Sequence, residues 1–122
     1  MKRDLQLIKE ILLYVEEHAE EGAAPIGRID LEGEYSQPQI AGHVQLLLID
    51  AGFVDGKICR THTSGSSYLV SRLTWSGSEF LDDARDERVW KRVLREVGYS
   101  ASVSLVKVML EKVRVELLGG VE

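Results

Sequence analysis

The stretch from Ser36 to Val54, SQPQIAGHVQLLLIDAGFV, predicts a helix that begins at a strong capping residue, ends at a glycine and continues directly into a strand. Ser36 is a favourable N-cap, and Gln39 three residues later can complete a capping box with it. Pro38 suits the first helical turn, because the N–H that proline lacks has no partner there. Gly52 marks the end of the helix. These signals place both helix ends, and the rest of the chain is interpreted around them.

The two sides of this helix differ in composition. One apolar face is made by Ile40, Val44, Leu47, Leu48 and Ala51. The opposite side carries Pro38, Gly42, Gln45 and Ile49, flanked by Gln39 and Leu46, and contains no lysine or arginine. His43 lies beside the apolar face, where we expect a partly buried, hydrogen-bonded histidine. The outward side therefore offers neutral amides and two aliphatic side chains.

The remaining elements follow from periodicity. Amphipathic spacing predicts a helix from Arg3 to about Glu20, with Lys9 outside its apolar stripe. Alternation over residues 26–33 suggests a short strand that could pair with a later hairpin, for which residues 53–60 and 68–75 are the expected strands. Three helices are expected after the hairpin: one with Trp75, Phe80, Leu81 and Ala84 directed inward, one beginning at Asp86, and one from about Ser102 to Leu118.

The composition is that of a soluble globular protein of one domain, with 122 residues, 44% hydrophobic and 29% charged. No apolar run approaches the length of a membrane span, and the N-terminus does not have the pattern of a signal peptide. A single cysteine, Cys59, excludes an internal disulfide and suits a reducing compartment. We therefore expect a cytoplasmic protein without membrane contact.

Charge is distributed unevenly along the chain, whose net charge is −5. Residues 1–56 carry four basic and eleven acidic side chains, whereas residues 57–75 carry Lys57, Arg60 and Arg72 with no acid. The predicted hairpin is thus positive on an acidic body. Because phosphate neutralisation supplies most non-specific DNA affinity, the net charge argues against strong DNA binding, and the hairpin is the segment best suited to contact phosphate.

The order of these elements resembles that of winged-helix proteins. The segments that carry this resemblance are Ala51-Gly52-Phe53-Val54 and Arg72-Leu73-Thr74-Trp75-Ser76-Gly77-Ser78-Glu79-Phe80-Leu81. The short segment 26–33 leaves little room for the first helix of a helix-turn-helix, which departs from the commonest form of the motif.

Nearly the whole chain also resembles an uncharacterised family of small bacterial and phage proteins, a domain of unknown function. The segments that carry this resemblance are Met1-Lys2-Arg3-Asp4-Leu5, Ala24-Pro25-Ile26, Tyr35-Ser36, Ile40 with His43-Val44, Ala51-Gly52 and Arg72-Leu73-Thr74-Trp75. The two resemblances imply an α+β fold: a winged helix-turn-helix-like domain with a β-hairpin wing and additional C-terminal helices. Residues 1–85 would form the winged-helix core, and residues 86–122 a helical extension that packs on the core and on a partner subunit.

The winged-helix resemblance implies double-stranded DNA as a partner, with the helix from Ser36 in the major groove and the hairpin on the backbone. The candidate contacts are Ser36, Gln37, Gln39 and Gln45 on the helix, and Lys57, Arg60, His62 and Arg72 on the hairpin. Capping and ordinary surface exposure are equally good roles for Gln39, and a short basic hairpin is commonly only solvated. The alternative function is a winged-helix protein-interaction module without DNA binding, which the aliphatic Leu46 and Ile49 favour.

The last two predicted helices carry surfaces that could meet a partner. In the final helix, Val103, Val106, Leu110, Val113 and Leu117 form a packing seam, while Leu105, Val108, Met109, Val115 and Leu118 lie away from it. We expect this second set to form a homodimer interface, the alternative being burial within one small helical core. In the helix before it, Arg88, Lys91, Arg92 and Arg95 share a face that could bind an acidic partner or nucleic acid, or could simply be solvated. Glu87 precedes Lys91 by four residues, the spacing of an in-helix ion pair.

Catalysis and metal binding are not predicted. Cys59 and His62 are two potential metal ligands, but no second pair follows at a zinc-binding spacing, and His18 and His43 belong to separate helices. The sequence contains no glycine-rich phosphate loop and no nucleophile elbow. We therefore expect no enzyme activity, no cofactor and no metal site.

Overall fold

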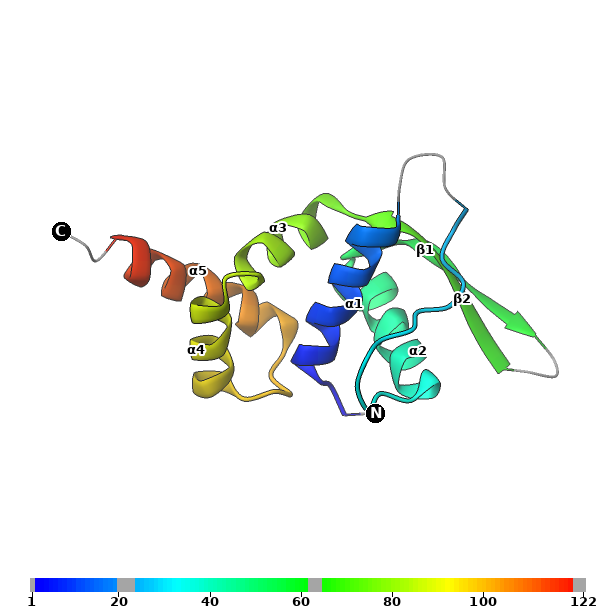
Figure 1. The fold of residues 1–122 in the computed structure, drawn as a ribbon, viewed down its shortest axis with the longest axis horizontal. Helices are drawn as coiled ribbons and strands as arrows, with labels where there is room; N and C mark the ends of the chain where they lie inside the picture. Colours follow the sequence, from blue (N-terminus) through cyan, green and yellow to red (C-terminus); the bar gives the residue numbers. More distant parts are fainter. Residues whose placement is uncertain (1, 20–23, 62–64, 120–122) are drawn as a thin grey trace.

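The computed structural model describes residues 2–19, 24–61 and 65–119. Its elements follow in the order α1 (Leu5–His18), α2 (Gln37–Gln45), η1 (Leu46–Ala51), β1 (Val54–Thr61), β2 (Gly65–Leu73), α3 (Trp75–Ala84), α4 (Glu87–Val97) and α5 (Val103–Gly119). The hairpin of β1 and β2 projects at one end of the molecule, α4 and α5 form the other end, and α1 lies between them (Figure 1). Within the described residues, the fold is therefore α+β, with five α-helices, a π-helix and one antiparallel hairpin.

Helix α1 lies at the centre of the core and has an unexpected buried charge. The Asp4 side chain caps it by accepting hydrogen bonds from the N–H groups of Gln6 and Leu7. Lys9, which the sequence pattern places outside the apolar stripe, is only 3% exposed. Its ammonium lies 2.7 Å from the Glu87 carboxylate and 5.3 Å from the centre of the Trp90 ring. Helix α4 supplies both partners and covers this position on α1.

The helix after Ser36 begins as predicted and widens halfway along. The Ser36 hydroxyl accepts a hydrogen bond of 3.2 Å from the Gln39 N–H. From Leu46 the chain continues as the π-helix η1, which ends at Gly52 with φ of +66°. The predicted helix therefore ends at its glycine, but its second half is π-helical rather than α-helical. Leu47 is fully buried and Ile49 is 62% exposed, which agrees with the apolar and outward sides assigned to them from the sequence.

The hairpin is anchored to the body through the segment that follows α1. Strands β1 and β2 pair antiparallel, with Val54 opposite Leu73 and an irregularity next to Gly56. The short strand predicted over residues 26–33 is reduced to a single bridge, in which Ile26 and Val70 exchange backbone hydrogen bonds of 2.8 and 2.9 Å. The hairpin is thus held to the preceding segment at one point along β2.

The junction between the hairpin and α3 is closely packed. The Thr74 hydroxyl donates to the Gly52 carbonyl at 2.6 Å and accepts from the Gly77 N–H at 3.1 Å. A Cβ atom on Gly77 would lie 2.0 Å from the carbonyl oxygen of Phe53, so only glycine fits there. The prediction that Trp75 points inward is wrong, because this first residue of α3 is 80% exposed. The inward direction predicted for Phe80, Leu81 and Ala84 is confirmed by their burial.

Helices α4 and α5 share one hydrophobic core with the preceding elements. Trp90 from α4 and Leu110 from α5 belong to the same buried cluster as Phe53 and Phe80. The ring centre of Phe80 lies 4.8 Å from that of Phe53 and 6.3 Å from that of Trp90. Aromatic contacts therefore connect the region next to the hairpin with the C-terminal helices.

Candidate nucleic-acid interface

A groove separates the first turn of α2 from the hairpin. Its walls are formed by Gly27, Arg28, Gln37, Pro38, Ala41, Ser67 and Tyr68. The bridge between Ile26 and Val70 brings residues 27 and 28 to this position, and the Tyr68 hydroxyl strengthens it by accepting a hydrogen bond of 3.0 Å from the Ile29 N–H. The groove thus lies between the helix and the hairpin that contain the predicted DNA contacts.

The four candidate residues on the helix are placed differently. Ser36 is exposed and caps α2, whereas Gln45 is exposed on its outer side. Gln37 is half-buried, and its amide donates to the Ile29 carbonyl at 3.0 Å, which holds it in a structural contact. Gln39 lines a different hollow, beside Glu10 and Glu34. The groove therefore contains only one of the four, and that one already has an internal partner.

Fewer of the hairpin cations are available to contact phosphate than the sequence suggests. Lys57 is exposed on β1. Arg72 is exposed, but its Nε donates to the Asp55 carboxylate at 3.0 Å, because the strand register places these two residues opposite each other. Arg60 lies in β1 opposite Ser66, but its side chain is outside the described residues, as is all of His62. Of the hairpin cations that the structure describes fully, Lys57 is therefore the one outside an ion pair.

Arg28 is a groove residue that the sequence analysis did not select. It lines the groove and is 67% exposed, and its Nε lies 2.9 Å from a carboxylate oxygen of Asp30. Because both partners are largely solvent-exposed, this ion pair is worth only about 0–1 kcal/mol and can exchange for another anion. Its position in the segment predicted to pair with the hairpin was the signal that could have identified it.

His43 is a structural residue, as the sequence analysis favoured. It is fully buried, and its Nε2 accepts a hydrogen bond of 2.9 Å from the Asp4 N–H. Since Nε2 accepts, the proton is on Nδ1, which donates to the Gln39 carbonyl at 2.9 Å. The neutral imidazole therefore connects the start of α1 to α2 and is not available to read a base.

Comparison with known proteins places the chain in a family. Residues 2–104 match the family model described as "Hypothetical protein (DUF2513)". The chain belongs to the DUF2513 family. This confirms the predicted resemblance to a domain of unknown function, and the match extends from the residues before α1 into the first turn of α5.

One relative of this DUF2513 protein spans almost the same length. It is an uncharacterized protein of Haemophilus influenzae that is 28% identical over 123 residues, covering 97% of this chain and 99% of the relative. No solved structure matches the chain. The described part of this DUF2513 chain contains no helix long and apolar enough to cross a membrane. Among the same residues, no group of three His, Cys, Asp or Glu side chains is placed to hold a metal ion.

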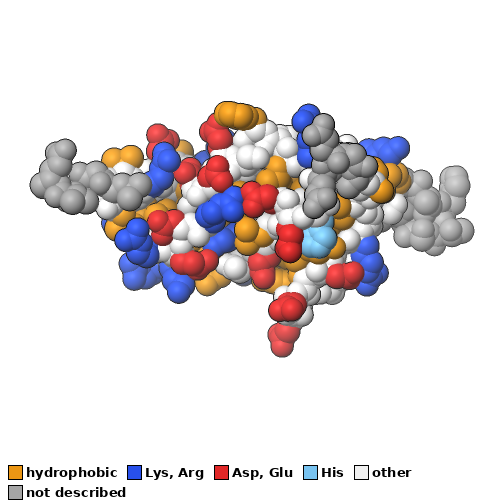
Figure 2. Space-filling view, turned by 45° about the horizontal axis from the view of Figure 1, so that its top comes forward, with side chains coloured by type: hydrophobic (Ala, Val, Ile, Leu, Met, Phe, Trp, Pro, Cys, Tyr) orange, Lys and Arg blue, Asp and Glu red, His pale blue; other side chains and the backbone are white. Residues whose placement is uncertain are grey.

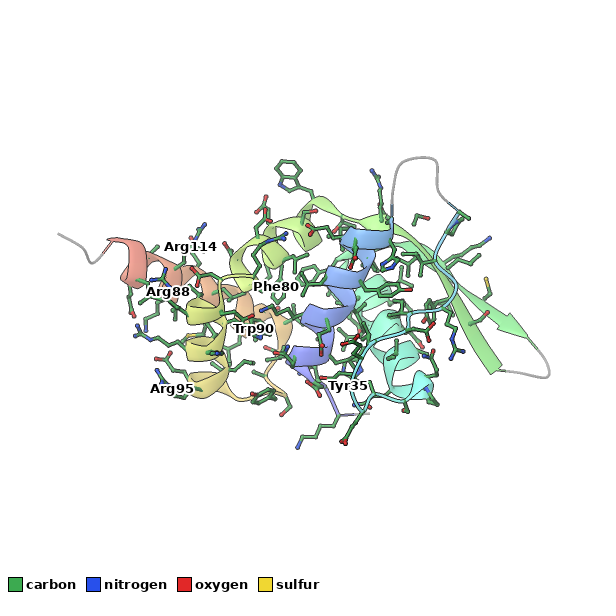
Figure 3. All side chains as sticks on the ribbon, viewed as in Figure 1. Tyr35, Phe80, Arg88, Trp90, Arg95 and Arg114 are labelled. Atoms are coloured by element: carbon green, nitrogen blue, oxygen red, sulfur yellow. The ribbon has the colours of Figure 1, made fainter. Side chains whose placement is uncertain are left out.

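The basic face of α4 in this DUF2513 protein lies far from the hairpin. Arg88 and Arg95 project from α4 at the opposite end of the molecule (Figure 3). In the view of Figure 2, Lys and Arg side chains occur toward both ends of the molecule, and acidic side chains lie between and among them. Arg92 is held by Glu96 and Glu116. The two basic regions therefore do not form one continuous strip.

The surroundings of Glu87 and Tyr35 shift the pKa values of both side chains. The Lys9 ammonium hydrogen-bonds Glu87 and lowers the pKa of that carboxyl, while Lys91 acts on it only at longer range. The predicted pairing of Glu87 with Lys91 is thus replaced by a contact with the buried lysine. Burial and the neighbouring Glu10 raise the pKa of Tyr35 to about 12. Tyr35 and Gln39 line the same hollow as Glu10, Glu32 and Glu34. This side of α2 is therefore acidic.

The predicted dimer residues on α5 do not all face solvent. Leu105, Val108 and Val115 are 45%, 63% and 59% exposed. Met109 is half-buried and packs against the core of the same chain. The side chain of Leu118 is outside the described residues. The exposed apolar face of α5 is therefore defined by Leu105, Val108 and Val115.

Proposed function

We propose that this protein is a winged-helix DNA-binding protein that contacts duplex DNA through the hairpin and the groove-facing side of α2. The observation that carries the proposal is the groove itself, which lies between a helix N-terminus and a hairpin and is bordered by the exposed Arg28. Winged-helix proteins combine a helix in the major groove with contacts from a neighbouring hairpin. The order of α2, β1 and β2 and the bridge at Ile26 support the same arrangement.

The arrangement departs from the commonest winged helix before α2. Residues 27–36, all of which the structure describes, contain no helix. Ile29 is fully buried in this segment, and its carbonyl accepts the hydrogen bond from Gln37. The segment thus fixes the start of α2, which is the role that the first helix of a helix-turn-helix performs.

In this proposal the cations and the helix make different contributions. Lys57 and Arg28 contact phosphates, because both are exposed and the ion pair of Arg28 is weak. The exposed side of α2 carries Gln45 and no cation, so it adds only neutral contacts to base edges. Binding of this kind is modest in strength and sensitive to salt. A regulator or an accessory factor of bacteria or their phages fits this behaviour.

The test is retention of a random duplex library by the purified chain at low and at moderate salt. Lys57→Ala and Arg28→Ala should each reduce retention at low salt. Lys91→Ala is the matched control, because it removes an equally exposed cation at the other end of the molecule. Absence of retained duplex at low salt, or an equal loss in the control, would contradict the proposal.

We also propose that the exposed apolar face of α5 binds a second copy of the chain. Val108 and Val115 are seven residues apart and therefore lie on the same side of the helix, with Leu105 one turn before. A two-fold dimer needs one self-complementary patch, which a single apolar helix face provides. Dimerisation without any duplex binding would instead favour the protein-interaction module.

A further inference from the structure

A hollow of about 270 Å³ lies between η1 and the first turn of α5, next to the residues that precede α1. Its polar walls include Arg3, Asp50, Ser104 and Lys107, and its apolar walls include Leu46 and Phe53. The hollow shares no lining residue with the groove beside the hairpin. It is therefore a separate site, independent of the proposed DNA contact.

Two cations face this hollow without a carboxylate partner. The Arg3 guanidinium is anchored by a hydrogen bond of 3.0 Å from Nη1 to the Ser100 carbonyl. Its Nε is shielded from solvent and has no acceptor among the described residues. The Lys107 ammonium lies 5.8 Å from the centre of the Phe53 ring. Because Nε is inaccessible, an anion in the hollow would be bound by the remaining guanidinium N–H groups of Arg3 and by the Lys107 ammonium.

The charges of the lining residues indicate which chemical groups a bound molecule must have. None of the ion pairs between described residues involves Arg3, Lys107 or Asp50, so two cations and one carboxylate face a common space unpaired. Their net charge favours a single negative charge, and Asp50 requires a hydrogen-bond donor. Ser104 lies in the first turn of the 17-residue helix α5, where the helix dipole also favours an anion. Asp50 and Leu46 belong to the π-helical segment, a geometry that is frequent at functional sites.

We propose that this hollow binds a small organic molecule that carries one oxyanion group and a neighbouring hydrogen-bond donor. The oxyanion accepts hydrogen bonds from Arg3 and Lys107, Asp50 accepts one from the donor, and the apolar part of the molecule packs on Leu46 and Phe53. The volume is close to the lower end of ordinary ligand pockets, which restricts the occupant to a small molecule.

The probe for the polar part of the site is inorganic phosphate at mildly acidic pH, where the monoanion with its O–H donors dominates. Sulfate, which has the same shape but no donor, is the comparison. Amide NMR shifts of the full chain should saturate with phosphate and be confined to residues 46–53 and 102–107, with sulfate binding several-fold more weakly. Non-saturating shifts, or shifts spread over the surface, would overturn the site. Equal binding of sulfate would overturn the role of Asp50.

Single substitutions separate the contributions of the lining residues to phosphate binding. Arg3→Gln should weaken phosphate binding by roughly 10-fold, about 1.4 kcal/mol, and Lys107→Gln provides the same test at an exposed position. Asp50→Asn should remove the preference for phosphate over sulfate. Lys2→Gln, an exposed neighbour of Arg3 that does not line the hollow, is the matched control and should change nothing. Unchanged phosphate binding in both Arg3→Gln and Lys107→Gln would refute the proposal.

Discussion

Replacing Gly77 with alanine should destabilise the protein, although alanine is the best helix former. Gly77 lies in the first turn of α3, where a Cβ atom would be 2.0 Å from the carbonyl oxygen of Phe53 and 2.8 Å from its carbonyl carbon. Both are backbone atoms, so no flexible side chain can move aside. Helix propensity alone would favour alanine by about 1 kcal/mol. Because the two effects have opposite signs, the sign of the stability change shows which one dominates.

The size of the loss in stability follows from the movement that the first turn of α3 must make. To reach ordinary contact distance, the first turn of α3 must shift by about 1 Å or more from Phe53. The shift strains the hydrogen bond from the Thr74 N–H to Phe53 and the one from the Thr74 hydroxyl to Gly52, of 2.9 and 2.6 Å. Each is worth about 1 kcal/mol, and overpacking adds about 1–3 kcal/mol. After the gain in propensity, the free energy of unfolding should fall by about 2–4 kcal/mol.

Urea unfolding followed by circular dichroism measures this change, which should also lower Tm by roughly 10 °C or more. Gly27→Ala is the matched control, because a Cβ atom there would make only ordinary contacts, with Cδ2 of Leu69 at 3.5 Å and the Tyr68 carbonyl oxygen at 3.9 Å. Its free energy of unfolding should stay within about 0.5 kcal/mol of the wild type. A Gly77→Ala protein as stable as the wild type, or more stable, would refute the close approach of α3 to Phe53.

Three other substitutions test the remaining contacts. His43→Leu should lower the free energy of unfolding by about 2–4 kcal/mol in urea, because the partly buried Asp4 N–H and Gln39 carbonyl lose their partner; a change below about 0.5 kcal/mol would contradict that role. Since Lys9 lowers the pKa of Glu87, the pair stabilises the fold above the ordinary carboxyl pKa and loses this contribution as the pH falls through the lowered value. Glu87→Gln should therefore lower Tm at neutral pH but not in strong acid, and an equal loss at both would argue against the pair. Val108→Lys combined with Val115→Lys should give a monomer in sedimentation equilibrium that still unfolds cooperatively, whereas a wild-type monomer would contradict the proposed dimer.

The features that could be predicted from the sequence are those satisfied within a few residues. The cap at Ser36 contacts the N–H of Gln39, and the cap at Thr74 contacts that of Gly77. Asp86 caps α4 through the N–H of Arg88. In each case the hydrogen-bonding partner is three residues away or closer, so the local pattern contains the whole interaction.

The features that could not be predicted depend on residues far apart in the chain. The partner of Lys9 is 78 residues away, so helical periodicity placed this lysine outside the apolar stripe and did not indicate its burial. The compensation of Arg72 by Asp55 depends on the strand register, which the sequence pattern did not determine. The exposed position of Arg28 beside the hairpin depends on the bridge at Ile26. These contacts changed the candidate interface more than they changed the fold.

The salt dependence of duplex binding tests most directly whether the hairpin and groove hold DNA through phosphate contacts. Each neutralised phosphate contributes about −0.9 to the slope of log K against log salt concentration. Contacts from Lys57 and Arg28 predict a slope of about −2, which Lys57→Ala should make less negative by about 1. Lys91→Ala should leave the slope unchanged. A slope near zero, or a slope that changes in Lys91→Ala but not in Lys57→Ala, would contradict the proposed interface.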